Sequence, residues 1–146
     1  MANASKEYNY HAYVLATYVS EENVKKVKSR LADNFTLEFV DMTEKVELLS
    51  DKLHTRDYYS KATYYRLFIP NMFPNLDKAL YLDSDIVVPG DISELFNIDL
   101  GNNLVGGATD SAVANNDIFI KYVEDVVGVD KSDDYFNAGI LLMNLK

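Results

Sequence analysis

The stretch Lys78-Ala-Leu-Tyr-Leu-Asp83-Ser-Asp85-Ile-Val-Val88 places two carboxylates between two apolar runs. The β-favouring residues on both sides predict a strand with buried flanks. Because residues i and i+2 of an extended segment point to the same side, Asp83 and Asp85 are expected to converge on one object. Two like charges held close together favour a cation between them, since one carboxylate would otherwise keep its proton. The alternative is a plain turn at the strand end, in which both aspartates cap backbone N–H groups.

The residues before this stretch predict a strand, a helix and a second strand. We expect a strand over Tyr8–Thr17 and another over Phe35–Val40, where apolar and polar residues alternate. Between them Ser20 is a helix N-cap, and Val24, Val27 and Leu31 recur at the spacing of one buried helical stripe. This order is typical of an α/β sheet.

The connection from the second strand back to the two carboxylates is less regular. Asp41–His54 is polar and mixed, and we expect an irregular or short helical segment there. Ser60–Phe68 has the pattern of a helix that ends near Pro70.

The residues after the two carboxylates continue the alternation of helices and strands. Asp91 is placed to cap a short helix that ends at Phe96, and Leu104–Asp110 reads as a buried strand. A second helix is expected to end at Gly128, and Tyr135–Leu145 leads from a turn into an apolar strand. The apolar positions of that second helix are Ile118, Phe119, Tyr122, Val123, Val126 and Val127.

Composition limits the classes of function. The chain has 146 residues, of which 48% are hydrophobic, as expected for one globular domain. Lys and Arg number 14 against 23 Asp and Glu, so the net charge of −9 argues against a nucleic-acid or anionic-membrane partner. Without cysteine the chain has no disulfide or thiolate metal site, which fits a cytoplasmic location. We see no signal peptide and expect no membrane span.

Two classes of enzyme carry a D-x-D motif after an apolar strand. In haloacid-dehalogenase-like phosphatases the first aspartate is a nucleophile and the second an acid/base. In nucleotide-sugar transferases with the GT-A fold, the same motif holds a divalent metal against a diphosphate. Asp83-Ser84-Asp85 resembles both motifs locally, so other segments must discriminate between them.

Three further segments supply that discrimination. They are Tyr64-Tyr-Arg66-Leu, Gly107-Ala-Thr-Asp110 and Phe136-Asn137-Ala-Gly139-Ile-Leu-Leu. Taken in order with the Asp83 stretch, they resemble glycosyltransferase family 8, which includes bacterial lipopolysaccharide hexosyltransferases and glycogenins. The resemblance covers nearly all of the chain. A phosphatase would also need a later acidic pair after an apolar strand, whereas Asp133-Asp134 follows polar residues.

The resemblance implies a fold and an activity. The fold is α/β and GT-A-like (Rossmann-like), with a mixed, mainly parallel sheet flanked by helices. The implied activity is metal-dependent transfer of a hexose from a UDP-sugar to a hydroxyl of a saccharide or glycolipid acceptor, with retention of anomeric configuration.

The resemblance also assigns roles to residues around the donor. Asp83 and Asp85 match the metal ligands, and their hard oxygens suit Mn²⁺ or Mg²⁺. Ser84 would lie beside the ribose of the nucleoside. Arg66 matches a basic residue that contacts the donor and supports catalysis, and a guanidinium is suited to neutralise a leaving diphosphate.

The remaining assigned residues would surround the transferred sugar. Asn137, Ala138 and Gly139 match the segment that lines the donor sugar, where an amide can bond hydroxyls and small neighbours let the sugar approach the backbone. Asp110 matches an acid near the sugar and the acceptor, so we weigh a catalytic orienting role equally with a strand-end cap. Since no residue is a secure nucleophile, front-face attack by the acceptor is the mechanism we favour.

The chain also departs from the family pattern. Tyr8–Thr17 resembles the family's second strand, and the nucleotide-binding opening strand and the C-terminal part, including a histidine that completes the metal site, have no match. We therefore expect residues 1–146 to be a partial GT-A-type domain with a sheet edge open to a second copy of the chain. The alternative functions are an inactive fragment, an interaction module or a nucleotide-sugar-binding module.

Overall fold

The computed structural model describes residues 3–48 and 61–146, in which strands and helices alternate as expected. The chain divides into two units, each of which makes contacts mainly among its own residues. The first comprises the described residues of Met1–Phe73 together with Pro89–Ser93, and the second comprises Pro74–Val88 and Glu94–Lys146. The segment expected to end at His54, and the first residue of the helix expected from Ser60, lie partly or wholly outside the described residues.

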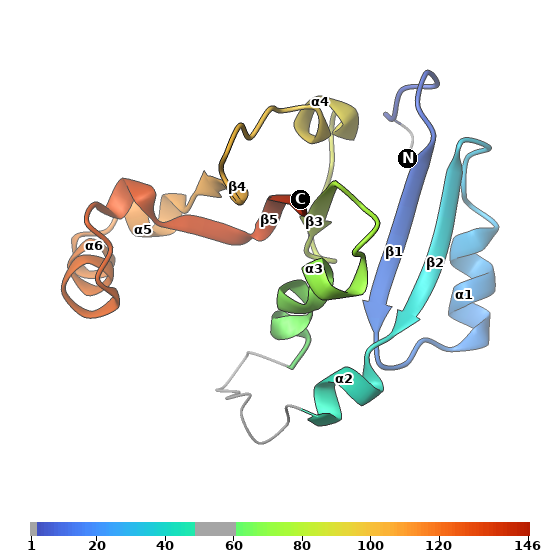
Figure 1. Cartoon of the computed structure of the whole chain (residues 1–146), viewed down its shortest axis with the longest axis horizontal. Helices are drawn as coiled ribbons and strands as arrows, with labels where there is room; N and C mark the ends of the chain where they lie inside the picture. Colours follow the sequence, from blue (N-terminus) through green and yellow to red (C-terminus); the bar gives the residue numbers. More distant parts are fainter. Residues whose placement is uncertain (1–2, 49–60) are drawn as a thin grey trace. The chain divides into compact units, whose positions relative to one another are not determined.

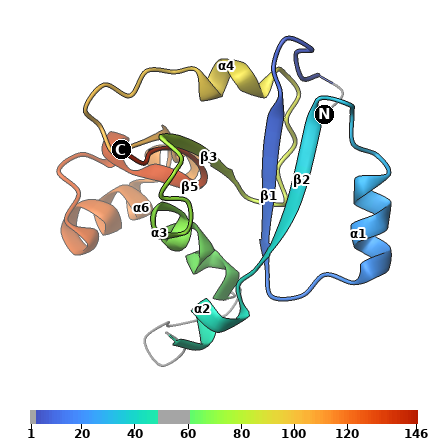
Figure 2. The same ribbon diagram turned by 45° about the vertical axis from the view of Figure 1, so that its right-hand side comes forward.

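The first unit contains the predicted strand, helix and strand. Strands β1 (Tyr10–Ala16) and β2 (Phe35–Asp41) pair in parallel along their whole length, from Tyr10 opposite Phe35 to Ala16 opposite Asp41. Their first rings, Tyr10 and Phe35, stack with centroids 4.5 Å apart. Helix α1 (Glu21–Lys28) connects the two strands and runs beside β2 in both views (Figures 1 and 2). The predicted order of strand, helix and strand is confirmed.

Helix α1 begins where the sequence places its cap, but its buried stripe is shorter than expected. The Ser20 hydroxyl accepts a hydrogen bond of 3.3 Å from the backbone N–H of Asn23, which satisfies one free donor of the first turn. Val24 is half-buried, whereas Val27 is 39% exposed. Leu31 lies beyond the last helical residue, so the helix is anchored mainly through Val24.

The first unit has a small apolar core next to the sheet. Helix α2 (Thr43–Leu48) follows β2, and a 3₁₀ helix over Lys61–Phe68 leads into α3 (Ile69–Met72). The helix predicted over Ser60–Phe68, ending near Pro70, corresponds to this 3₁₀ helix, but helical structure continues directly into α3. Pro70 occupies the first turn of α3, where a missing N–H costs no hydrogen bond. The core consists of Met42, Val46 and Tyr65, with Leu15, Val40, Phe68 and Met72 packed against it.

The second unit is built on a three-stranded antiparallel sheet. The central strand is β5 (Phe136–Asn144), with β3 (Lys78–Leu82) on one side and β4 (Val105–Thr109) on the other. The described part of the chain is therefore α/β, as expected, with one parallel and one antiparallel sheet in place of the single mixed, mainly parallel sheet that we expected. Buried side chains of β5 anchor the unit, namely Leu141, Leu142 and Met143.

The helices of the second half agree with the sequence prediction in position but not in burial. Helix α4 (Ile92–Phe96) follows Asp91, and α5 (Ser111–Ala114) is followed by α6 (Asp117–Tyr122). One π turn extends α6 to Val127, and Gly128 ends it with φ 83°, a conformation that favours glycine. Of the apolar stripe, Val123 is 3% exposed but Ile118 is 77% exposed. Of the expected buried face, only Val123 is buried.

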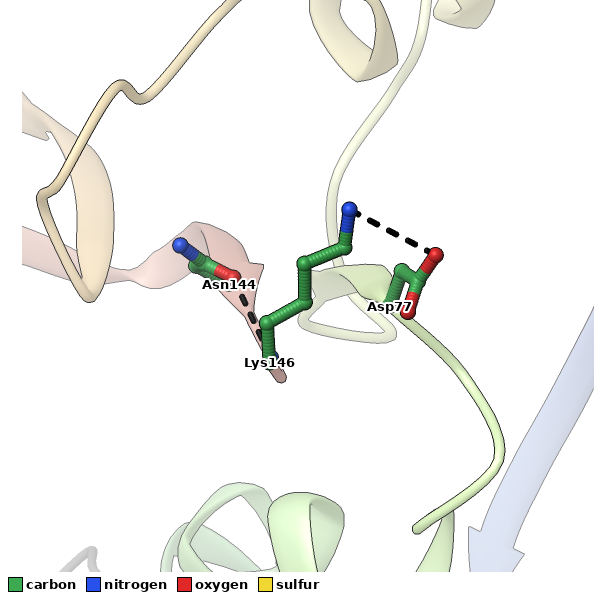
Figure 3. A network of polar contacts seen from close by, with 3 residues as sticks. All are labelled: Asp77, Asn144 and Lys146. Atoms are coloured by element: carbon green, nitrogen blue, oxygen red, sulfur yellow. Dashed lines mark hydrogen bonds and ion pairs between the residues drawn. The ribbon is translucent and has the colours of Figure 1, made fainter.

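The end of the chain is tied to the start of β3 in the second unit. The backbone N–H of Leu145 donates to the Asp77 carbonyl at 2.9 Å, and Lys146 Nζ lies 3.6 Å from Asp77 Oδ2. The N–H of Lys146 donates to Asn144 Oδ1 at 3.1 Å (Figure 3). Since both charged side chains are largely exposed, the ion pair contributes little to stability.

Within the described part of the chain, no helix combines the length and apolar character that a membrane span needs.

Candidate functional site

The two aspartates of the D-x-D stretch do not lie in one extended segment. Strand β3 ends at Leu82, and Ser84 and Asp85 form a turn. Asp83 is half-buried while Asp85 is exposed, and Val87 beyond them is 88% exposed. The prediction of a strand with two buried flanks is therefore wrong on its downstream side. The reason is that the last backbone hydrogen bond between this segment and β5 is the one made by Asp83.

That last contact joins the D-x-D stretch to the Asn137 segment. The backbone N–H of Asp83 donates to the Gly139 carbonyl at 2.8 Å, one step beyond the pairing of Leu82 with Ile140. Two motifs far apart in the sequence are thus hydrogen-bonded neighbours in the second unit.

The Asp83 carboxylate is hydrogen-bonded to a tyrosine on one side and lies against a glycine on the other. The Tyr81 hydroxyl donates to Asp83 Oδ1 at 2.5 Å. On the other side, a Cβ added to the buried Gly139 would lie 2.8 Å from Asp83 Oδ2, closer than any side chain tolerates. Sequence reasoning missed Tyr81, although the i, i+2 rule for strands places it on the same side as Asp83.

Asn137 is oriented by its own turn. Its Oδ1 accepts a hydrogen bond of 2.8 Å from the backbone N–H of Gly139, so the amide nitrogen is left as the group that can donate outward from this exposed side chain. The register on the β4 side jumps here, from Gly107 opposite Leu141 to Ala108 opposite Asn137. This bulge in β5 re-aims the Asn137–Gly139 segment, as bulges near functional sites commonly do.

Asp110 caps a helix in the second unit. Its Oδ1 accepts from the N–H groups of Ala112 at 2.9 Å and Val113 at 3.3 Å, and its own N–H donates to the Tyr135 carbonyl at 3.0 Å. Since β3 and β4 both run antiparallel to β5, their carboxyl ends meet the same half of β5. Asp83, Asp110 and Asn137 therefore lie along one end of this sheet. The cap is present, and the catalytic role remains a prediction.

Arg66 belongs to the first unit. It lies in the 3₁₀ helix, is half-buried, and its Nε donates to the Thr63 carbonyl at 2.9 Å. This bond restrains the stem of the side chain. Its role toward the donor remains a prediction.

The donor set suits a hard divalent cation, with few protein ligands. Asp83 and Asp85 offer carboxylate oxygens, which Mn²⁺ and Mg²⁺ prefer, and the glycine beside Asp83 keeps its oxygens uncrowded. Over residues 3–48 and 61–146, no group of three or more His, Asp or Glu side chains is arranged to hold a metal ion. A metal held here would complete its coordination with oxygens of the ligand and water.

Comparison with known proteins identifies the lineage. The family model described as glycosyl transferase family 8 matches residues 1–146. A protein of Haemophilus influenzae, provisionally named a glycosyltransferase, is 31% identical over 143 residues, which cover 98% of this chain and 41% of that protein.

Solved structures show the same relationship. The bifunctional glycosyltransferase WbbM superposes with a TM-score of 0.82 at 33% identity, over 99% of this chain and 27% of WbbM. The galactosyltransferase LgtC, solved with donor and acceptor sugar analogues, gives a TM-score of 0.71 at 30% identity, over 92% of this chain and 46% of LgtC. The chain thus spans less than half the length of each of these three relatives.

Proposed function

Because the chain belongs to glycosyltransferase family 8, we propose that it transfers a hexose from a UDP-sugar to a hydroxyl acceptor, with Asp83 and Asp85 as ligands of Mn²⁺ or Mg²⁺. The observation that carries this proposal is the hydrogen bond between Asp83 N and Gly139 O, at 2.8 Å. It brings the carboxylates that suit a metal next to the segment that suits a sugar. A site for a sugar diphosphate needs both features side by side.

The metal, when bound, offsets the negative charge of the diphosphate as UDP departs. The protein's own residues position the donor around it. The amide nitrogen of Asn137 donates to a sugar oxygen, because its Oδ1 is engaged by Gly139. Ser84, exposed in the turn, is available to the ribose, and the small Ala138 and Gly139 allow the sugar to approach the backbone.

Arg66 and Asp110 complete the proposed chemistry. The guanidinium of Arg66 stabilises charge that develops on the leaving diphosphate, in a chain whose net charge of −9 otherwise repels it. Asp110, fixed by its bond to the Tyr135 carbonyl, orients the acceptor hydroxyl, which is a saccharide or glycolipid hydroxyl. With no secure nucleophile, the acceptor attacks from the face that UDP leaves, and configuration is retained.

The decisive experiment measures hydrolysis of a panel of UDP-hexoses with and without Mn²⁺. We expect turnover that requires the metal and falls at least about tenfold in Asp85→Ala. Asp125→Ala, which removes an exposed carboxylate from the π turn, is the matched control and should behave as the wild type. Equal turnover in Asp85→Ala and wild type would refute the metal assignment.

A nucleotide-sugar-binding module without turnover is the second candidate. It is favoured by the two-carboxylate donor set, since no third His, Asp or Glu joins it in the described part of the chain. It predicts that calorimetry detects binding of UDP with Mn²⁺ while no UDP-hexose is hydrolysed. An interaction module or inactive fragment predicts neither binding nor turnover.

Two further features belong to the proposal. Residues 1–146 form one partial GT-A-type domain that works in the cytoplasm, which the lack of cysteine supports. The chain associates with a second copy through a sheet edge, and sedimentation velocity at several protein concentrations tests this association.

A further inference from the structure

We propose that Tyr81 is a positioning residue that holds the Asp83 carboxylate ready for the metal, an inference that rests on the proposed function. The Tyr81 hydroxyl donates to Asp83 Oδ1 at 2.5 Å, and this bond is partly buried. A hydrogen bond to an ionised carboxylate is stronger than one between two neutral groups, and it is directional. It limits rotation of the carboxylate about its last side-chain bond.

The tyrosine is itself fixed by the sheet. Tyr81 is in β3 opposite Leu141 of β5, a residue that is only 6% exposed. The backbone of Tyr81 is therefore fixed by its pairing with β5, while its hydroxyl reaches Asp83. A group held by a strand positions its partner better than one held by a loop.

Gly139, which has no side chain, leaves room for the same carboxylate on the other side. The ideal Cβ position of Gly139 lies 2.8 Å from Asp83 Oδ2 and 3.3 Å from Asp83 Cγ. The backbone between the two residues is locked by the bond from Asp83 N to Gly139 O at 2.8 Å. The Tyr81 hydroxyl thus orients the Asp83 carboxylate before any ligand arrives, in a space that exists because residue 139 has no side chain.

The Asp85 carboxylate is not oriented in this way. Asp85 is exposed in the turn, and no hydrogen bond or ion pair joins its side chain to another described residue. The two proposed ligands therefore differ in role. Asp83 provides a fixed anchor point for the metal, and Asp85 closes on the metal as it binds.

The test is Tyr81→Phe, which removes only the hydroxyl. Groups that orient a metal ligand from behind contribute about 10- to 100-fold to metal affinity, so the Mn²⁺ dissociation constant should rise at least about tenfold. Electron paramagnetic resonance of free Mn²⁺, titrated with the full chain in the presence and absence of UDP, measures this without reliance on turnover.

Tyr10→Phe is the matched control. The Tyr10 hydroxyl also donates to a carboxylate, Asp91 Oδ1, at 3.0 Å, but in the first unit and away from the D-x-D stretch in the sequence. It should leave Mn²⁺ affinity unchanged. If Tyr81→Phe and Tyr10→Phe both bind Mn²⁺ as the wild type does, Tyr81 has no positioning role.

A second variant protects the test if Tyr81→Phe does not fold. Gly139→Ala displaces the same carboxylate from the other side and should also weaken Mn²⁺ binding, and wild-type affinity in this variant would contradict the inference.

The proposed function fails separately. If the wild type and Asp85→Ala show the same Mn²⁺ affinity, the metal site itself is refuted together with the role of Tyr81. If Asp85→Ala loses the metal but Tyr81→Phe keeps wild-type affinity, only the role of Tyr81 is refuted.

Discussion

The backbone N–H of Asp83 donates a 2.8 Å hydrogen bond to the carbonyl oxygen of Gly139. This bond is the point at which the end of β3 meets the middle of β5, one step past the pairing of Leu82 with Ile140. The carboxylate of Asp83 then lies over a residue without a side chain. The chemistry proposed for the D-x-D stretch depends on this meeting, because neither segment alone brings a carboxylate and a sugar-facing amide together.

Gly139→Ala should destabilise the chain by about 1–3 kcal/mol, the usual cost of forcing an extra group into a packed site. The added Cβ would lie 2.8 Å from Asp83 Oδ2 and 2.9 Å from Asn137 Oδ1. Urea denaturation measures the change. Gly90→Ala is the control, since an added Cβ there meets no atom within 4 Å. Equal stability of Gly139→Ala and wild type would mean that the carboxylate can move aside freely.

Asp110→Ala should cost about 1 kcal/mol, because its Oδ1 caps the N–H groups of Ala112 and Val113. Asp110→Asn should be nearly as stable as the wild type, since Asn is as good a cap as Asp. The pair of variants separates capping from charge. If turnover of UDP-hexose onto an acceptor falls at least about tenfold in Asp110→Asn, the charge acts on the acceptor. Wild-type turnover in this variant would reduce Asp110 to a helix cap.

Arg66→Lys should lower kcat at least about tenfold while the KM for the UDP-sugar changes less. Lysine keeps the charge but loses the planar set of donors, one of which, Nε, binds the Thr63 carbonyl at 2.9 Å. Steady-state kinetics with saturating Mn²⁺ measure both constants. The control is Arg30→Lys, at an exposed position just after α1. An increase in KM alone would assign Arg66 to donor binding without a role in departure of UDP.

Stability should decrease in acid through Asp91. The backbone N–H of Ser93, 3.0 Å from Asp91 Oδ1, lowers the pKa of this carboxyl below its usual value, with a further contribution from the Tyr10 hydroxyl. A lowered folded-state pKa contributes stability above the ordinary value of about 3.9, and that stability is lost as pH falls through the folded-state pKa. Thermal unfolding between about pH 6 and pH 2 should show a steeper loss in wild type than in Asp91→Asn. Parallel profiles would refute the linkage.

The pair Tyr10 and Asp91 also predicts a loss of stability at high pH. Burial, followed by the hydrogen bond to Asp91, raises the pKa of Tyr10 above its usual value. A raised folded-state pKa contributes stability that is present below the ordinary value of about 10 and lost as pH rises through the folded-state pKa. Tyr10→Phe should therefore be less sensitive than wild type to pH above about 10. Ultraviolet titration of tyrosinate, compared between the two proteins, assigns the late-titrating phenol.

Local patterns in the sequence were sufficient wherever neighbouring residues decide the structure. Ser20 caps α1 because its hydroxyl reaches an N–H three residues away, and Gly128 ends the second helix because it accepts a positive φ. The parallel pair β1 and β2 follows from two alternating runs joined through a helix. The family motifs, read in order, also identified the lineage without coordinates.

Predictions failed where burial depends on a partner segment. Val87 was expected to be buried in the apolar flank after the two carboxylates and is 88% exposed, because β3 has no further pairing with β5 beyond Asp83. Ile118 has the spacing of a buried stripe and is 77% exposed, because periodicity specifies a face but not what covers it. Pro70 was expected to follow the end of a helix, and instead it lies in the first turn of α3, which continues directly from the 3₁₀ helix.

The sequence by itself determined which chemical groups this chain has: two adjacent carboxylates, an amide beside a glycine, and the family they signify. Only the tertiary structure decided how they are used. The spacing of Asp83 and Asp85 predicted a shared direction, but β3 ends at Leu82, before both of them, so Asp83 keeps a bond to β5 while Asp85 lies in a turn. Strand pairing brings Gly139 to Asp83, where its carbonyl accepts the Asp83 N–H and its missing side chain leaves room for the carboxylate that Tyr81 orients.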